Sequence, residues 1–155
     1  MSYVDRNLLP GEEVLYRAKL HWIVFAAPML VFVVAVVILI TSAVGNRDYA
    51  PGSGIGVVFV IVAGGLAFGR WLAWISSEFA VTNKRVLIKV GFIRRHSLEL
   101  LLQKVEGIGV DQGILGRVFD YGTIIVTGTG GTKEPFKNIA APLEFRKQVQ
   151  SRVTA

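Results

Sequence analysis

The clearest chemical signal in this sequence is a group of cationic side chains between residues 84 and 95. Guanidinium and ammonium groups donate charge-assisted hydrogen bonds to phosphate, and each cation near an anionic membrane surface contributes about 1 kcal/mol. The spacing therefore predicts a surface that binds anionic lipid headgroups, and a solvated cationic face that fixes topology is the alternative. The residues are Lys84, Arg85, Lys89, Arg94 and Arg95.

Other residue types that perform chemistry are absent or badly spaced. The chain has no cysteine, and its two histidines, His21 and His96, lie far apart with no metal-ligand pattern. The glycines from Gly107 to Gly113 lack the spacing of a dinucleotide loop, and those from Gly128 to Gly131 lack the lysine of a phosphate loop. We therefore expect no catalytic residue, metal or cofactor, and interpret the two glycine clusters as a bulge and a hairpin turn.

Two long apolar runs dominate the first half of the chain, in which no further chemistry is visible. Residues 22–44 carry no charge, and at 1.5 Å per residue a helix of this length spans roughly 34 Å, enough for the ~30 Å hydrocarbon layer. Residues 55–75 carry only Arg70, near Trp71 and Trp74, as expected at a membrane interface. This predicts a transmembrane hairpin over 22–75, with an outer turn at 45–54. Pro28 either bends the first helix or marks its first turn.

The flanking charges predict the orientation of this hairpin. Arg6, Arg17 and Lys19 precede it and the cationic group follows it, whereas the outer turn holds only Arg47. Because Lys and Arg accumulate on the cytoplasmic side, both termini are expected there. A cleaved signal peptide fits less well, since the first run is long and a second one follows.

Small residues line one face of the second apolar run. Gly65, Gly69 and Ala73 recur every four residues, a spacing that permits close approach of helices. The partner is either the first span of the same chain or a second copy, which would make a homo-oligomer.

After Ser77 the pattern changes to the period of two that is typical of strands. Residues 85–90 place Val86, Ile88 and Val90 on one face, and Arg85 and Lys89 on the other. The sequence predicts a turn at 83–84, a strand pair at 92–102 and 105–111, and an amphipathic helix from Pro142 with Phe145, Val149 and Val153 as its stripe. The remaining strands are expected at 78–82, 121–129 and 133–140.

Side chains also alternate between two faces in the N-terminal segment from Glu12 to His21. This pattern predicts a short strand that adds to a sheet edge of its own chain or of a neighbouring chain. A juxtamembrane linker is the alternative. The predicted organisation is thus a cytoplasmic segment 1–21, the hairpin 22–75 and a basic β-rich domain 77–155. That domain holds 12 Lys and Arg against 7 Asp and Glu.

Four motifs in this order resemble the bacterial pleckstrin-homology-like (PH-like) family of two-helix membrane proteins. They are Thr82-Asn83-Lys84-Arg85, QGILGR at 112–117, Tyr121-Gly122 and Ile139 to Pro142, and the hairpin and the N-terminal LLPGEEVLY fit members of this size. The resemblance covers 77–153. It implies an α+β membrane protein whose strongly bent sheet or barrel is capped by a C-terminal helix, in the bacterial plasma membrane. It implies no known activity.

The sequence therefore predicts a membrane-anchored binding or scaffold module rather than an enzyme. Its expected partners are membrane lipids and an unidentified membrane or cytoplasmic protein, and no nucleic acid. The alternative is an oligomeric subunit of a membrane transport or channel assembly. The sequence assigns no role to the turn 45–54.

Overall fold

The computed structural model describes residues 3–44, 50–92, 96–131 and 133–153. Its contacts divide the chain into two compact units. One is Trp22–Leu72, and the other combines Met1–His21 with Ala73–Ala155. The apolar unit is therefore inserted into the sequence of the second unit, which is called the domain below.

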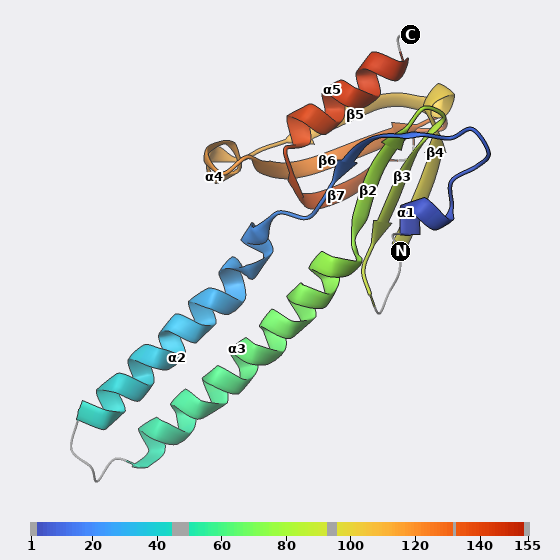
Figure 1. Cartoon of the computed structure of the whole chain (residues 1–155). Helices are drawn as coiled ribbons and strands as arrows, with labels where there is room; N and C mark the ends of the chain where they lie inside the picture. Colours follow the sequence, from blue (N-terminus) through green and yellow to red (C-terminus); the bar gives the residue numbers. More distant parts are fainter. Residues whose placement is uncertain (1–2, 45–49, 93–95, 132, 154–155) are drawn as a thin grey trace. The chain divides into compact units, whose positions relative to one another are not determined.

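The apolar unit consists of two helices (Figure 1). A short 3-10 turn, η1 (Trp22–Phe25), leads into α2 (Ala26–Val44), and α3 (Ala50–Ser76) follows. Pro28 is the third residue of α2, so it marks the first regular turn, where a missing amide proton costs nothing. The predicted start of the second helix at residue 55 is wrong. The helix already begins at Ala50, and Pro51 falls in its first turn, where proline is accepted. Arg47 and the rest of 45–49 lie outside the described residues.

Small residues bring these two helices together, but not the ones singled out in the sequence. A Cβ atom built on Gly56 would lie 2.6 Å from the Leu39 side chain, and Ala35 and Ala63 are buried. A Cβ atom built on Gly65 or on Gly69 would meet no atom within 4 Å. The face formed by Gly65 and Gly69 is therefore not covered by α2.

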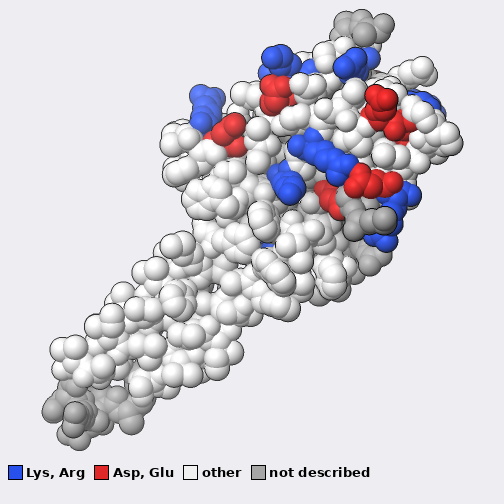
Figure 2. All heavy atoms as spheres, viewed as in Figure 1, with Lys and Arg blue, Asp and Glu red and all other residues white. Residues whose placement is uncertain are grey.

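Both helices are long and apolar enough to cross a membrane, over Trp22–Val44 and Ser53–Ser76. In the most apolar stretch of Trp22–Val44 only 17% is buried, and in that of Ser53–Ser76 only 11% is buried. A core helix of a soluble protein is mostly buried, whereas these helices expose residues such as Met29, Leu30 and Ile61. The face of the two helices shown in Figure 2 is almost free of charged side chains.

The domain contains two antiparallel sheets and a C-terminal helix, which confirms the predicted α+β class. The first sheet has the order β1-β2-β3-β4 and the second β5-β6-β7. The strands of the first sheet are β1 (Val14–Ala18), β2 (Glu78–Thr82), β3 (Arg85–Val90) and β4 (His96–Leu101). Those of the second are β5 (Val105–Asp111), β6 (Tyr121–Gly128) and β7 (Lys133–Ala140).

The N-terminal strand β1 pairs with β2 of the same chain, with Arg17 opposite Ala80 and Ala18 opposite Phe79. The prediction that this segment adds to a sheet edge is confirmed, and the edge belongs to its own chain. The two apolar helices therefore connect neighbouring strands of a single sheet.

The core lies between the two sheets and α5 (Pro142–Val153), which packs on β5, β6 and β1 (Figure 1). Phe79 and Ile88 from the first sheet, Ile124 from the second and Phe145 from α5 are all fully buried in one cluster. The predicted stripe of α5 is confirmed for Phe145 and Val149. It is wrong for Val153, the last residue of α5, which is 47% exposed.

The predicted pairing of two strands needs correction. The stretches near 92–102 and 105–111 form strands, but β4 pairs with β3 and β5 pairs with β6. The 3-10 turn η2 (Leu102–Lys104) between them carries the chain from one sheet to the other. The interpretations of the glycine clusters are confirmed: the β5 register shifts between Val105 and Gly107, and Gly131 N–H donates to Gly128 O in the β6–β7 turn.

The outer face of the first sheet is covered rather than solvated. The helix α1 (Tyr3–Arg6) packs there, and Val4, Ala80 and Leu87 form a second small cluster. The backbone N–H groups of Tyr3 and Val4 both donate to the Glu78 carboxylate at 3.0 Å. The N-terminal segment thus covers the face of β3 on which Arg85 and Lys89 were expected to meet water.

Candidate binding surface

Arg85, one of the predicted headgroup ligands, has a side chain that is only 12% exposed. It begins β3, and its guanidinium holds the Glu12 carboxylate through two bonds, from Nε to Oε1 at 2.9 Å and from Nη2 to Oε2 at 3.0 Å. A third donor, Nη1, contacts Glu99 Oε2 at 2.6 Å. Since these donors already have carboxylate acceptors, the geometry favours a structural role for Arg85.

The environment of Glu12 explains why this pair is stable. Burial of the carboxylate opposes ionisation, but hydrogen bonds from Arg85, from the Leu9 N–H and from the Thr82 hydroxyl outweigh it, so the pKa of Glu12 falls from 4.5 to about 2. The pKa of Arg85 is raised by the same hydrogen bond. Both groups are therefore charged throughout the physiological range, which satisfies each partner in the buried site.

Lys84 and Lys89, the other predicted ligands that the structure describes, lie near opposite ends of β3. Lys84, in the β2–β3 turn, donates to Pro10 O at 3.0 Å. Lys89 lies over the Tyr3 ring, 4.7 Å from its centroid, near the opposite end of β3. Five residues of extended chain separate the two lysines by roughly 17 Å. Arg94 and Arg95 lie outside the described residues, so headgroup binding by this set stays a prediction.

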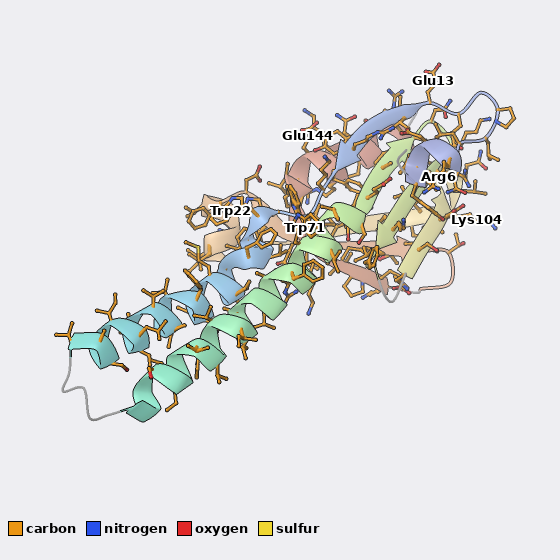
Figure 3. All side chains as sticks on the ribbon, turned by 60° about the horizontal axis from the view of Figure 1, so that its bottom comes forward. Arg6, Glu13, Trp22, Trp71, Lys104 and Glu144 are labelled. Carbon is orange, nitrogen blue, oxygen red and sulfur yellow. The ribbon has the colours of Figure 1, made fainter. Side chains whose placement is uncertain are left out.

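The points where the domain continues into the apolar helices lie close together. Trp74 Nε1 donates to Leu20 O at 2.8 Å, and His21 N–H donates to Asn138 O at 2.7 Å. The His21 ring stacks on Tyr121 at 5.3 Å. The chain therefore leaves and re-enters the domain beside the first residues of β6. Figure 3 shows Trp22 and Trp71 near the ends of the helices that continue into the domain.

A cavity of about 310 Å³ opens at this junction, within the domain. Its cationic lining comes from Arg17 and Lys19, on and just after β1; Trp74 and Ile75 contribute apolar surface, and Glu78 a carboxylate. Glu78 already accepts the two α1 N–H groups, and Arg17 pairs with Asp5. Lys19 is exposed and is the cation that we consider most available to a ligand in this cavity.

The two histidines do not form a site together. His21 belongs to the junction, and burial lowers the pKa of its imidazole. His96, on β4, is exposed, and its Nε2 lies 3.4 Å from Glu134 Oε2. Over the described ranges, no group of three or more His, Asp or Glu side chains is placed to hold a metal ion.

Comparison with known proteins agrees with this architecture. The family model of the bacterial PH domain matches residues 20–153, which includes both apolar helices. The chain belongs to this family. No curated protein and no solved structure matches it.

Sequence reasoning missed two parts of this surface. The Glu12–Arg85 pair joins residues 73 positions apart, and its only signal was the presence of a carboxylate and a guanidinium in the N-terminal LLPGEEVLY and in the turn motif. The junction cavity depends on how β1 pairs with β2, which brings Lys19 near Trp74. Local spacing contains no information on either.

Proposed function

We propose that this protein is a membrane-anchored PH-like binding module. In this proposal α2 and α3 cross the bacterial plasma membrane, both termini are cytoplasmic, and the domain presents a surface to anionic lipid headgroups and to a protein partner. PH domains are typically non-catalytic binding modules, and the family match supports this class of function.

The observation that carries the proposal is the position of the helices in the sheet. β1 ends at Ala18, shortly before Trp22, and β2 begins at Glu78, directly after α3. These connections leave no long linker at either end. If the helices lie in a bilayer, the domain is held at its surface, and β1 and β2 are held on the same side.

The first apolar helix is also unsuited to removal as a signal peptide. Cleavage after it would remove β1 together with Ala18, which is buried in the main core. It would also remove α1 and Glu12, which cover the outer face of the first sheet and hold the Arg85 guanidinium. A retained membrane anchor agrees with the fold.

The junction cavity supports a preference for anionic headgroups. Lys19 and Arg17 lie beside Trp74, an amphipathic residue that is typical of the membrane interface. A volume of about 310 Å³ is at the lower end of the range for small-molecule sites and fits a phosphate-bearing headgroup. Lys89, which does not line the cavity, would add cationic charge outside it.

Lipid retention by the whole protein tests this proposal. The full chain in mild detergent is mixed with phosphatidylglycerol and phosphatidylcholine, and the bound lipids are counted by native mass spectrometry. We expect preferential retention of phosphatidylglycerol, which weakens in Lys19→Gln and at high salt. The matched control is Lys133→Gln, an exposed lysine at the start of β7. Equal retention of the two lipids, or equal loss in both variants, would contradict headgroup binding.

A second candidate function, a subunit of an oligomeric transport or channel assembly, is favoured by one observation. The Gly65 and Gly69 positions have open space around them and are not packed against α2. In membranes, such small-residue faces allow helices of different chains to approach closely.

A further inference from the structure

Four large apolar side chains are exposed on, and directly after, a short helix between β5 and β6. The helix α4 (Ile114–Val118) and the residue that follows it leave Ile114 84%, Leu115 62%, Val118 70% and Phe119 44% exposed. Elsewhere in the domain, the exposed large apolar residues of the described chain are dispersed among several elements. A soluble surface rarely concentrates apolar side chains in one short segment unless they bind something.

The fold holds α4 in a defined position. Gly116 faces inward, since a Cβ atom there would lie 2.6 Å from Tyr121 O. The Gln112 side-chain amide donates to Tyr121 O at 3.1 Å, and Ala141 N–H donates to Asp120 O at 3.0 Å. With Gly116 against the sheet, the apolar residues on both sides of it are held outward. Their exposure is thus built into the fold of this loop.

The position of α4 in the domain indicates what these side chains meet. Tyr121, which follows α4 and begins β6, stacks on His21, the last residue before the first apolar helix. His21 N–H also donates a hydrogen bond to Asn138 O, and the indole N–H of Trp74, near the end of the second helix, donates one to Leu20 O. Both connections to the apolar helices and α4 therefore lie at the same end of the domain.

We propose that α4 inserts its apolar side chains into the interfacial layer of the bilayer that α2 and α3 cross. This inference rests on the proposed function, because it requires those helices to be in the membrane. Short segments with exposed apolar side chains bind at the headgroup–acyl boundary through buried apolar area. The inserted helix gives the domain a contact with the membrane in addition to its two covalent connections, and so restricts its orientation.

The charges around α4 make this contact different from headgroup binding. Arg117 is the one charged residue in α4, and the carboxylates of Asp111 and Asp120 lie on either side of the segment. The local charge does not favour an anionic surface. Insertion of α4 is therefore expected to depend little on anionic lipid, whereas the lipid preference assigned to Lys19 does depend on it.

The absence of cysteine from the chain allows a direct test by site-specific labelling. Full-length Val118→Cys carries a fluorophore and is reconstituted into vesicles that contain either lipid-borne nitroxides or a water-soluble quencher. Thr129→Cys is the matched exposed control. It lies just past the far end of β6, roughly 26 Å along the strand from Tyr121. Val34→Cys, in the middle of α2, reports whether the helices are in the bilayer.

We expect lipid-borne quenching at positions 34 and 118, and aqueous quenching at 129, in vesicles of phosphatidylcholine alone and of its mixture with phosphatidylglycerol. If position 34 is lipid-exposed while 118 is as water-accessible as 129, the inference on α4 is wrong and the anchor stands. If 118 is shielded from both quenchers, a protein partner or second copy covers α4, and the inference is again wrong. If position 34 is not lipid-exposed, the proposed function itself fails.

Discussion

Arg85 and Glu12 form a two-bond ion pair, with Nε–Oε1 at 2.9 Å and Nη2–Oε2 at 3.0 Å, and this pair joins the N-terminal segment to β3. The apolar unit lies between them in sequence, so the pair closes the domain around the insertion. Both side chains are removed from solvent to a large extent, Glu12 completely. Their role is therefore to complete the fold.

Removal of the Glu12 charge should destabilise the domain. In Glu12→Gln the largely buried Arg85 guanidinium loses one of its two carboxylate partners and keeps Glu99, so we expect a cost of about 3 kcal/mol, the lower end of the range for a broken buried pair. Glu13→Gln removes the same charge from an exposed neighbour and should change stability by less than about 0.5 kcal/mol. Unfolding of the full chain in detergent by urea, followed by tryptophan fluorescence, measures both. Equal stability of the two variants would assign no structural role to the pair.

The same carboxylate should make stability depend on acid pH. The pKa of Glu12 is about 2 in the folded chain against an ordinary value of 4.5, so the unfolded chain binds the proton first. The stabilisation is complete above pH 4.5 and is lost as the pH falls toward 2, to a total of about 3 kcal/mol. The stability difference between the natural chain and Glu12→Gln should shrink over this window. A stability difference between the two chains that stays constant down to pH 3 would contradict the low pKa of Glu12.

The domain should fold without its apolar helices only if the N-terminal segment is kept. Because Leu20 O accepts the Trp74 indole N–H, the two connections are adjacent, and a short Gly/Ser linker can replace 22–72. We expect this chain to be soluble and to unfold cooperatively, whereas residues 77–155 alone lack β1 and Glu12 and should aggregate. Circular dichroism and sedimentation distinguish them. A stable, monomeric 77–155 fragment would show that β1 is dispensable.

The small residues of α3 should divide into two classes. Gly56→Leu introduces a side chain where Leu39 already lies, so it should disrupt the packing of α2 on α3. Gly65→Leu and Gly69→Leu have open space in the chain and should leave that packing intact, but should remove contacts between chains if the protein self-associates. Crosslinking in native membranes measures the oligomer. An unchanged oligomer in the Gly65 and Gly69 variants would exclude that face.

Sequence patterns predicted the elements that depend on local periodicity. Residues 22–44 carry no charge over a membrane-spanning length, and the alternation at 85–90 correctly placed Val86 and Ile88 in the core. The strand from Tyr121 and the helix from Pro142 were also predicted correctly, because β-branched residues and an N-terminal proline are strong local signals.

Features that arise from long-range pairing were not predictable in this way. Arg85 was assigned to a solvated or lipid-facing surface because the four-residue helix α1 is too short for a periodic signal and its cover over β3 was invisible. The short helix α4 was missed for the same reason, although its motif QGILGR was noticed. The small-residue motif at Gly65 is real in sequence, but α2 packs against Gly56 instead, since the register between two helices depends on both of them.

The central claim, a domain held on the cytoplasmic side by a membrane-crossing hairpin, is tested most directly by cysteine accessibility in intact cells. Single cysteines are introduced in the full chain at Glu13, Arg47 and Thr129, and are treated with a membrane-impermeant maleimide before and after permeabilisation. The account predicts labelling of position 47 in intact cells, and of positions 13 and 129 only after permeabilisation. Labelling of position 13 or 129 in intact cells, or protection of position 47 until permeabilisation, would contradict it.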